Sequence, residues 1–200
     1  NLLLMLQEAP VSNGPCYFPR NPLYTYIAWI DAKGTGKNKA CLSILAWRGA
    51  QGTFGVNYAT EDTLSAFGVK ALEILKDFGN PVICWERNGV GEGIHQIFRA
   101  QGYPPDKIYF QDREHGKHGV AMTANLRDIQ LVRLAMAIDN LEVRLVSRPA
   151  IQECLNFPRN AALWDKTPND QVMAMAGALW LERQPGIPGI GSRQRVTKFF

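Results

Sequence analysis

Apolar residues follow two different periods along this chain, and the change between them predicts its secondary structure. Three early segments are apolar, aromatic or β-branched at nearly every position, which is typical of buried strands. Short links join these segments, so we predict an antiparallel meander. From residue 60 onward, segments with helical spacing alternate with short apolar runs. The predicted strands are residues 24–31, 40–47, 52–59, 81–85, 107–110 and 141–145, and the predicted helices are residues 60–78, 92–101, 123–138, 148–155 and 170–183.

This order of elements predicts an α/β fold with a mixed sheet. A strand that is reached through a helical crossover normally lies parallel to the earlier strand in the same sheet. We therefore place residues 81–85 parallel beside residues 24–31, after the three antiparallel strands. Helices then cover both faces of the sheet.

The composition divides the chain into three parts. Residues 1–22 contain several prolines and no sustained period, which predicts an extended linker. Residues 23–184 carry the strand and helix patterns of the domain. Residues 185–200 combine glycine and proline breaks with Arg and Lys, which predicts a flexible basic C-terminal tail. Because the sequence begins with Asn, we expect the linker to connect to a missing upstream domain.

The overall composition is typical of one globular domain with a sizeable core, since 46% of the 200 residues are hydrophobic and 20% are charged. No apolar run reaches the length that a membrane-spanning helix needs. The four cysteines are scattered, so they indicate core residues in a reducing compartment rather than a disulfide framework or a zinc site. The net charge of +4 permits an anionic partner such as nucleic acid.

Three acidic residues stand where the predicted fold brings separate segments together. Asp31 and Glu86 end the two parallel strands, and Asp170 lies in the first turn of the last helix. The carboxyl edge of such a sheet is where α/β folds bind ligands. Clustered carboxylates repel one another unless a cation neutralises them. The edge is therefore a candidate Mg²⁺ or Mn²⁺ site, and two such ions about 4 Å apart can hydrolyse a phosphodiester.

Other interpretations of these residues are open. Asp31 precedes a glycine turn, where an Asp usually bonds its own backbone. Glu86 can be a strand end that faces solvent, and Asp170 can simply be a helix-terminus residue. The GTGK sequence at residues 34–37 is not a P-loop, because Asn38 stands where Ser or Thr is needed. His115 and His118 lie in a charged loop, where they are either solvated or placed near a metal or a phosphate.

Basic residues near the acids and on the third predicted helix are candidates for phosphate contacts, although a solvated surface charge is the ordinary alternative. These residues are Lys33, Lys37, Lys39, Arg87, Lys117 and Arg127.

Several motifs together resemble a known family. They are IAWIDAKGTG, VICWERNGVGEGIHQIF, HGVAMTANLRDIQLVRLAMAI leading to LVSRPAIQECLNF, and PNDQVMAMAGALWL, which together span about Tyr24 to Leu181. In this order they resemble the ribonuclease H-like nuclease domain of the large terminase subunit of tailed bacteriophages, the motor that packages viral DNA. The Glu-x-Asn-x-x-Gly element and the Gln-Glu-x-x-x-Phe element are the more distinctive motifs.

The resemblance implies a role for each acid. Asp31, Glu86 and Asp170 would be the catalytic ligands of Mg²⁺ or Mn²⁺, with two ions expected. The family often has paired acids at the last motif, where this chain has Asn169 as a further candidate ligand. Asn88 would belong to the DNA-contacting loop after the second acid.

The implied activity is metal-dependent endonuclease cleavage of double-stranded viral DNA during genome packaging. The implied partners are an upstream ATPase domain, the portal protein and the small terminase subunit, with no membrane. The implied location is the cytoplasm of the infected host cell rather than the mature virion. The alternatives are a nuclease of the junction resolvase or transposase type, and a non-catalytic module that docks on DNA or on a portal-like protein.

Overall fold

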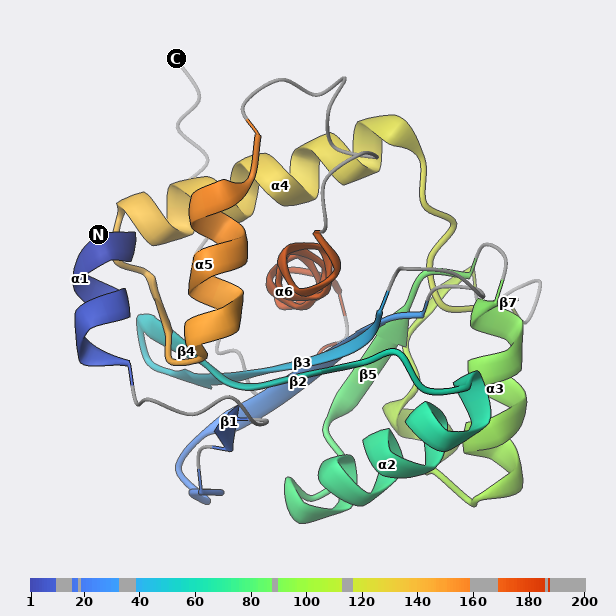
Figure 1. The fold of residues 1–200 in the computed structure, drawn as a ribbon. Helices are drawn as coiled ribbons and strands as arrows, with labels where there is room; N and C mark the ends of the chain where they lie inside the picture. The colour runs from blue at the N-terminus through green and yellow to red at the C-terminus, as the bar shows by residue number, and fades with distance from the viewer. Residues whose placement is uncertain are drawn as a thin grey trace.

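A computed structural model gives the arrangement of the helices and strands (Figure 1). The described residues are 1–9, 16–17, 19–32, 39–87, 90–112, 117–158, 169–185 and 187. The helices are α1 (Leu2–Glu8), α2 (Leu64–Asp77), α3 (Gly91–Ala100), α4 (Ala124–Asp139), α5 (Arg148–Asn156) and α6 (Asp170–Leu181). The strands are β1 (Cys16–Tyr17), β2 (Thr25–Asp31), β3 (Ala40–Arg48), β4 (Gln51–Thr60), β5 (Val82–Trp85), β6 (Phe110–Asp112), β7 (Lys117–His118) and β8 (Val143–Leu145).

Six strands form one mixed sheet with the order β1-β4-β3-β2-β5, and β8 pairs with β4 outside this path. The strands β2, β3 and β4 form the antiparallel meander that the sequence predicts. The strand β5 follows the α2 crossover and lies parallel to β2, as the handedness of such crossovers favours. The predicted class, an α/β mixed sheet with three antiparallel strands followed by parallel strands, is confirmed.

Helices cover both faces of the sheet (Figure 1). The helices α2 and α3 lie on one face, whereas α6 lies on the other face with α4 above it. Alternate side chains of β2 point to opposite faces of the sheet. Ile27 and Trp29 pack in the core on the α6 side, whereas Ala28 and Ile30 pack in the core on the α2 side. Because both faces are covered, β2 is a continuous apolar run rather than an alternating one.

The helix α6 is a buried central element. Every residue from 170 to 179 is buried, which suits a helix that lies between a sheet and another helix. Gly177 makes a very close approach to the sheet, because a Cβ atom there would lie 2.3 Å from Cδ2 of Trp29. This packing fixes the axis of α6 against β2.

The N-terminal segment differs from the predicted extended linker. Met5 of α1 is only 6% exposed and belongs to the core on the α6 side. Arg144 Nη2 lies 2.8 Å from Glu8 Oε2, and β1 pairs with β4. These tertiary contacts hold the described parts of residues 1–22 against the domain. A seven-residue helix and a two-residue strand are too short to give a clear period in the sequence.

One further predicted element differs from the structure, and another lies almost wholly outside the described residues. The strand predicted over residues 107–110 begins instead at Phe110, because Pro105 starts a 3₁₀ turn that ends at Lys107. The tail predicted over residues 185–200 lies outside the described residues, apart from Pro185 and Ile187. Among the described helices, none combines the length and the apolar composition that crossing a bilayer requires.

Candidate active site

Asp31 closes β2 on the face that α6 covers. Side chains alternate along a strand, so Asp31 projects to the same side as Ile27 and Trp29. Asp31 is 4% exposed, and it pairs across the sheet with Cys41 of β3. Burial of a carboxylate is costly unless its charge is compensated. This position is therefore more demanding than that of an ordinary solvated turn residue.

Glu86 stands beside Asp31 at the end of the neighbouring strand. The parallel register of β2 and β5 ends with the pair Ile30 and Trp85, immediately before the two acids. Cys84 packs in the core on the α6 side, so alternation directs half-buried Glu86 to that same face. The topology thus brings the first two predicted acids to adjacent positions.

Asp170 reaches the same edge of the sheet from α6. It is 5% exposed, and its Oδ2 accepts a hydrogen bond of 2.9 Å from the backbone N–H of Lys39. Lys39 directly precedes β3, whose residue Cys41 pairs with Asp31. Asn169, the further candidate ligand, is 7% exposed and occupies the N-cap position of α6. The hydrogen bond ties the start of α6 to the strand beside Asp31.

The donor chemistry at this edge fits a hard divalent cation, since carboxylate oxygens are the ligands that Mg²⁺ and Mn²⁺ prefer. The structure brings the positions of all three acids to one edge. Among the residues that it describes, however, no three carboxylate, imidazole or thiolate side chains stand at a spacing that would hold one metal ion. The assignment of Asp31, Glu86 and Asp170 as ligands therefore stays a prediction.

Glu153 of α5 is a neighbour of this edge that was not among the predicted site residues. Its Oε1 accepts a hydrogen bond of 2.9 Å from the backbone N–H of Val172, and its Oε2 lies 3.4 Å from Nε2 of Gln171. Burial raises the pKa of Glu153 and the negative charge of Asp170 raises it further, while the hydrogen bonds from Val172 and Gln171 oppose the shift. The Gln-Glu-x-x-x-Phe motif marks this residue, but its role depends on a contact between separate helices.

The predicted phosphate contacts lie in several parts of the fold. The backbone N–H of Lys39 bonds Asp170, and its exposed Nζ lies 3.7 Å from Glu61 Oε1. Arg87 directly follows Glu86, and its Nη1 is buried with no hydrogen-bond partner in the described part of the chain. Exposed Lys117 lies on β7 and half-buried Arg127 lies on α4. The remaining candidates, Lys33, Lys37 and Asn88, fall outside the described residues.

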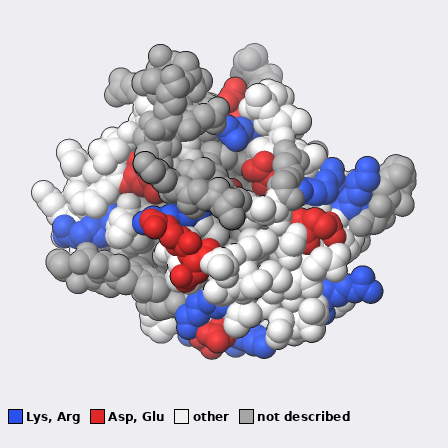
Figure 2. Space-filling view, turned by 45° about the vertical axis from the view of Figure 1, so that its right-hand side comes forward, with Lys and Arg blue, Asp and Glu red and all other residues white. Residues whose placement is uncertain are grey.

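Charge is mixed on the face of the molecule that Figure 2 shows. Figure 2 shows Lys and Arg side chains interspersed with Asp and Glu side chains over the visible described surface, without one continuous basic patch. This distribution agrees with the modest net charge of +4.

His118 lies on the opposite face of the sheet from Asp31. Its ring stacks on His95 with the ring centroids 3.6 Å apart, and His95 in turn stacks on Trp85 of the α2-side core. Burial lowers the pKa of His118, and the nearby His95 lowers it further. His118 is therefore part of a ring cluster against α3, while His115 lies outside the described residues.

Replacing His118 with phenylalanine is expected to make stability less sensitive to acid. The lowered pKa means that, below the ordinary value of 6.5, the unfolded chain takes up a proton more readily than the folded protein. The contribution of His118 to stability is thus fully present above this value and is lost as the pH falls below it. Phenylalanine keeps a ring against His95 and Phe110 but does not titrate. Urea unfolding at about pH 7.5 and about pH 5.5 should show a smaller difference for the variant, and an equal difference would contradict the assignment.

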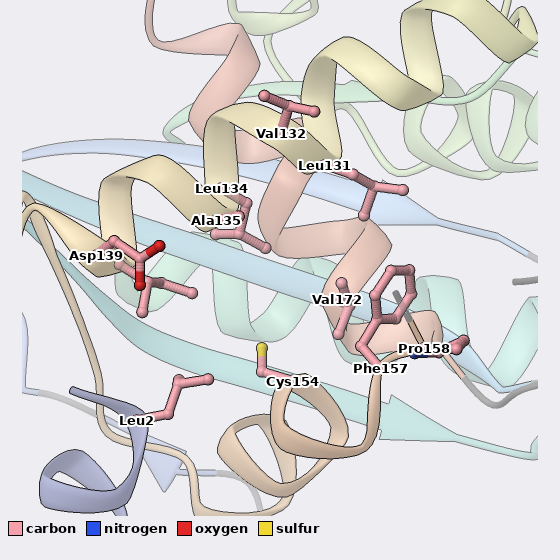
Figure 3. Close-up of a pocket in the computed structure, with 11 residues that line it drawn as sticks. Leu2, Leu131, Val132, Leu134, Ala135, Asp139, Cys154, Phe157, Pro158 and Val172 are labelled. Atoms are coloured by element: carbon pink, nitrogen blue, oxygen red, sulfur yellow. The ribbon is translucent and has the colours of Figure 1, made fainter. Parts of the chain in front are cut away.

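The protein also contains an apolar cavity. Its volume is about 310 Å³, and side chains of α1, α4, α5 and α6 point toward one another around it (Figure 3). Among the lining residues that the structure describes, Asp139 is the one charged side chain. This cavity lacks the polar groups that phosphodiester chemistry requires, so the edge of the sheet remains the candidate active site.

Comparisons with known proteins identify the fold. No family model matches the sequence, and no curated protein matches it. The large terminase nuclease of the thermophilic phage G20c with bound magnesium is similar in structure, with a TM-score of 0.66, 16% identity, and coverage of 90% of this chain and 96% of that chain. The human cytomegalovirus terminase nuclease domain, soaked with manganese, is similar with a TM-score of 0.60 and 10% identity, and the match covers 89% of this chain and 93% of that chain. The nuclease domain of the P22 large terminase is similar with a TM-score of 0.57 and 15% identity, and the match covers 82% of this chain and 85% of that chain.

These similarities extend over most of each chain at low sequence identity, so they establish the architecture. The chain has the ribonuclease H-like fold of large terminase nuclease domains, which confirms the resemblance that its motifs indicate.

Proposed function

We propose that this chain is a divalent-metal-dependent endonuclease that cleaves double-stranded DNA during the packaging of a viral genome. The observation that carries the proposal is the parallel pairing of β2 and β5, which ends immediately before Asp31 and Glu86, together with the hydrogen bond from the Lys39 backbone beside β3 to Asp170. Ligand sites of α/β sheets lie at this edge. Ionised acids from two strand ends and one helix start would repel one another at this edge unless a cation neutralised their charge.

In this proposal each acid binds metal from a different element. Asp31 and Glu86 project from adjacent parallel strands, and Asp170 approaches from α6 while its Oδ2 remains tied to the Lys39 backbone. Asn169 would supply an amide oxygen in place of a second acid. Two bound ions, Mg²⁺ or Mn²⁺, would supply the Lewis acidity that phosphodiester hydrolysis needs. The similar terminase nucleases carry magnesium, zinc or cobalt or were soaked with manganese, which supports a divalent cation.

Basic side chains would position the DNA backbone. Arg87 is one proposed contact, because it directly follows Glu86 at the end of β5. Lys33, Lys37, Lys39, Asn88, Lys117 and Arg127 are the further proposed contacts. Contacts of this kind bind DNA without reading its sequence, so we infer cutting with little sequence preference.

The biological setting is inferred from the shared fold. We infer an upstream ATPase domain, together with the portal protein and the small terminase subunit as partners, and action in the cytoplasm of the infected host cell. The similarity to large terminase nuclease domains supports a terminase setting.

The test is cleavage of supercoiled plasmid DNA with Mg²⁺, with Mn²⁺ and with EDTA. We expect nicked and linear products with either metal and none with EDTA, because the carboxylates alone cannot activate water at neutral pH. To test the resolvase alternative, cleavage of a four-way DNA junction is compared with cleavage of a linear duplex of the same length. A resolvase would cut the junction preferentially. DNA binding without cleavage under any metal would contradict the proposal and favour a docking module.

A further inference from the structure

The first turn of α6 takes a hydrogen-bond acceptor from another helix. The N–H groups at the start of a helix have no acceptor within the helix and need one from elsewhere. The Val172 N–H, at the third position of α6, donates to Glu153 Oε1 of α5 at 2.9 Å. Glu153 Oε2 lies 3.4 Å from the side-chain nitrogen of Gln171. One carboxylate therefore engages the two residues that follow Asp170.

Two opposing effects act on Glu153. A carboxylate at a helix N-terminus is stabilised by the helix dipole and by the N–H donors there. Burial and, to a lesser extent, the nearby charge of Asp170 disfavour the ionised form of Glu153. A neutral acceptor would satisfy the Val172 N–H without this repulsion.

The position of Asp170 depends on the same turn. Packing of Gly177 against Trp29 fixes the axis of α6, but Gly177 lies two helical turns beyond Asp170. At its first turn, α6 is held by Asp170 on the backbone of Lys39 and by Glu153 on Val172 and Gln171. Loss of the second clamp would allow this turn to fray and the Asp170 carboxylate to leave its place.

We propose that Glu153 is a positioning residue, which clamps the first turn of α6 and thereby holds the Asp170 carboxylate at the metal edge. Its carboxylate acts through hydrogen bonds to the helix rather than by contact with substrate. The inference rests on the proposed function, because it assumes that Asp170 binds metal. It assigns a task to a residue on α5 that lies on none of the three acid-bearing segments.

The test compares Glu153→Ala and Glu153→Gln with Gln152→Ala, an exposed neighbour on the same helix. In metal-free protein, amide hydrogen exchange of residues 170–173 should be at least about tenfold faster in Glu153→Ala, since Val172 loses its acceptor. The Mn²⁺ concentration for half-maximal plasmid cleavage should rise by about tenfold, as is typical when an outer-shell partner of a ligand is removed. Glu153→Gln keeps an oxygen for Val172 and should give intermediate values, whereas Gln152→Ala should match the wild type.

Two results would overturn the inference while the proposed function stands. One is wild-type exchange and Mn²⁺ dependence in Glu153→Ala. The other is faster exchange spread evenly over α6 and the sheet with unchanged Mn²⁺ dependence, which would show a purely structural role. If the wild type itself neither cleaves DNA nor binds Mn²⁺ by calorimetry, the proposed function fails, and the assignment of Glu153 fails with it.

Discussion

Asp31→Asn is expected to lower plasmid cleavage at saturating Mn²⁺ by about a thousandfold, the order of loss seen when a central catalytic group is removed. Asparagine preserves the size of the side chain and one oxygen but removes the negative charge that holds a cation. Asp31 lies at the end of β2, beside Glu86 and across from the segment that bonds Asp170. Its charge is therefore central to the proposed site.

The thermal stability of Asp31→Asn should not fall with its activity. Removing one charge from a group of neighbouring acids relieves repulsion in the metal-free protein, so Tm should stay the same or rise. The matched control is Asp77→Asn at the exposed end of α2, which should cleave DNA like the wild type. Cleavage by Asp31→Asn within tenfold of the wild type would contradict the assignment. A large fall in Tm would instead mean that the carboxylate has a structural role.

Most of the sheet could be predicted because its signals are local. The apolar run ending at Asp31 predicts a strand over residues 24–31, and the observed strand is Thr25–Asp31. The helical crossover before Val82 then determines that β5 lies parallel to β2. The helix α1 could not be predicted in this way, because its stability comes from tertiary contacts such as the burial of Met5.

The candidate site divides in the same manner. The place of Asp31 and Glu86 follows from strand ends and parallel pairing, which the sequence pattern reports. The contact of Glu153 with Val172 joins two helices whose relative position depends on packing, so no spacing in the sequence reveals it. Likewise, His118 is placed against α3 by stacking on His95, a tertiary contact that its charged sequence context does not indicate.

Gly177→Ala is expected to be destabilising although alanine is the better helix former. The substitution gains about 1 kcal/mol of helix propensity. The new Cβ would lie 2.3 Å from Cδ2 of Trp29, a ring that is 1% exposed in the middle of β2 and cannot move aside. Overpacking of this kind costs about 1–3 kcal/mol or more, so we expect a net loss of stability in urea unfolding.

Gly68→Ala in α2 is the matched control for that loss. A Cβ there would lie 3.0 Å from Cγ2 of Ile97, a half-buried side chain that can shift, so the propensity gain should make this variant neutral or slightly more stable. Because Gly177 sets the distance between α6 and β2, its substitution should also displace Asp170 and raise the Mn²⁺ requirement for cleavage. Equal stabilisation by the two substitutions would show that α6 can move away from Trp29 without cost, and the close packing would then not determine where Asp170 lies.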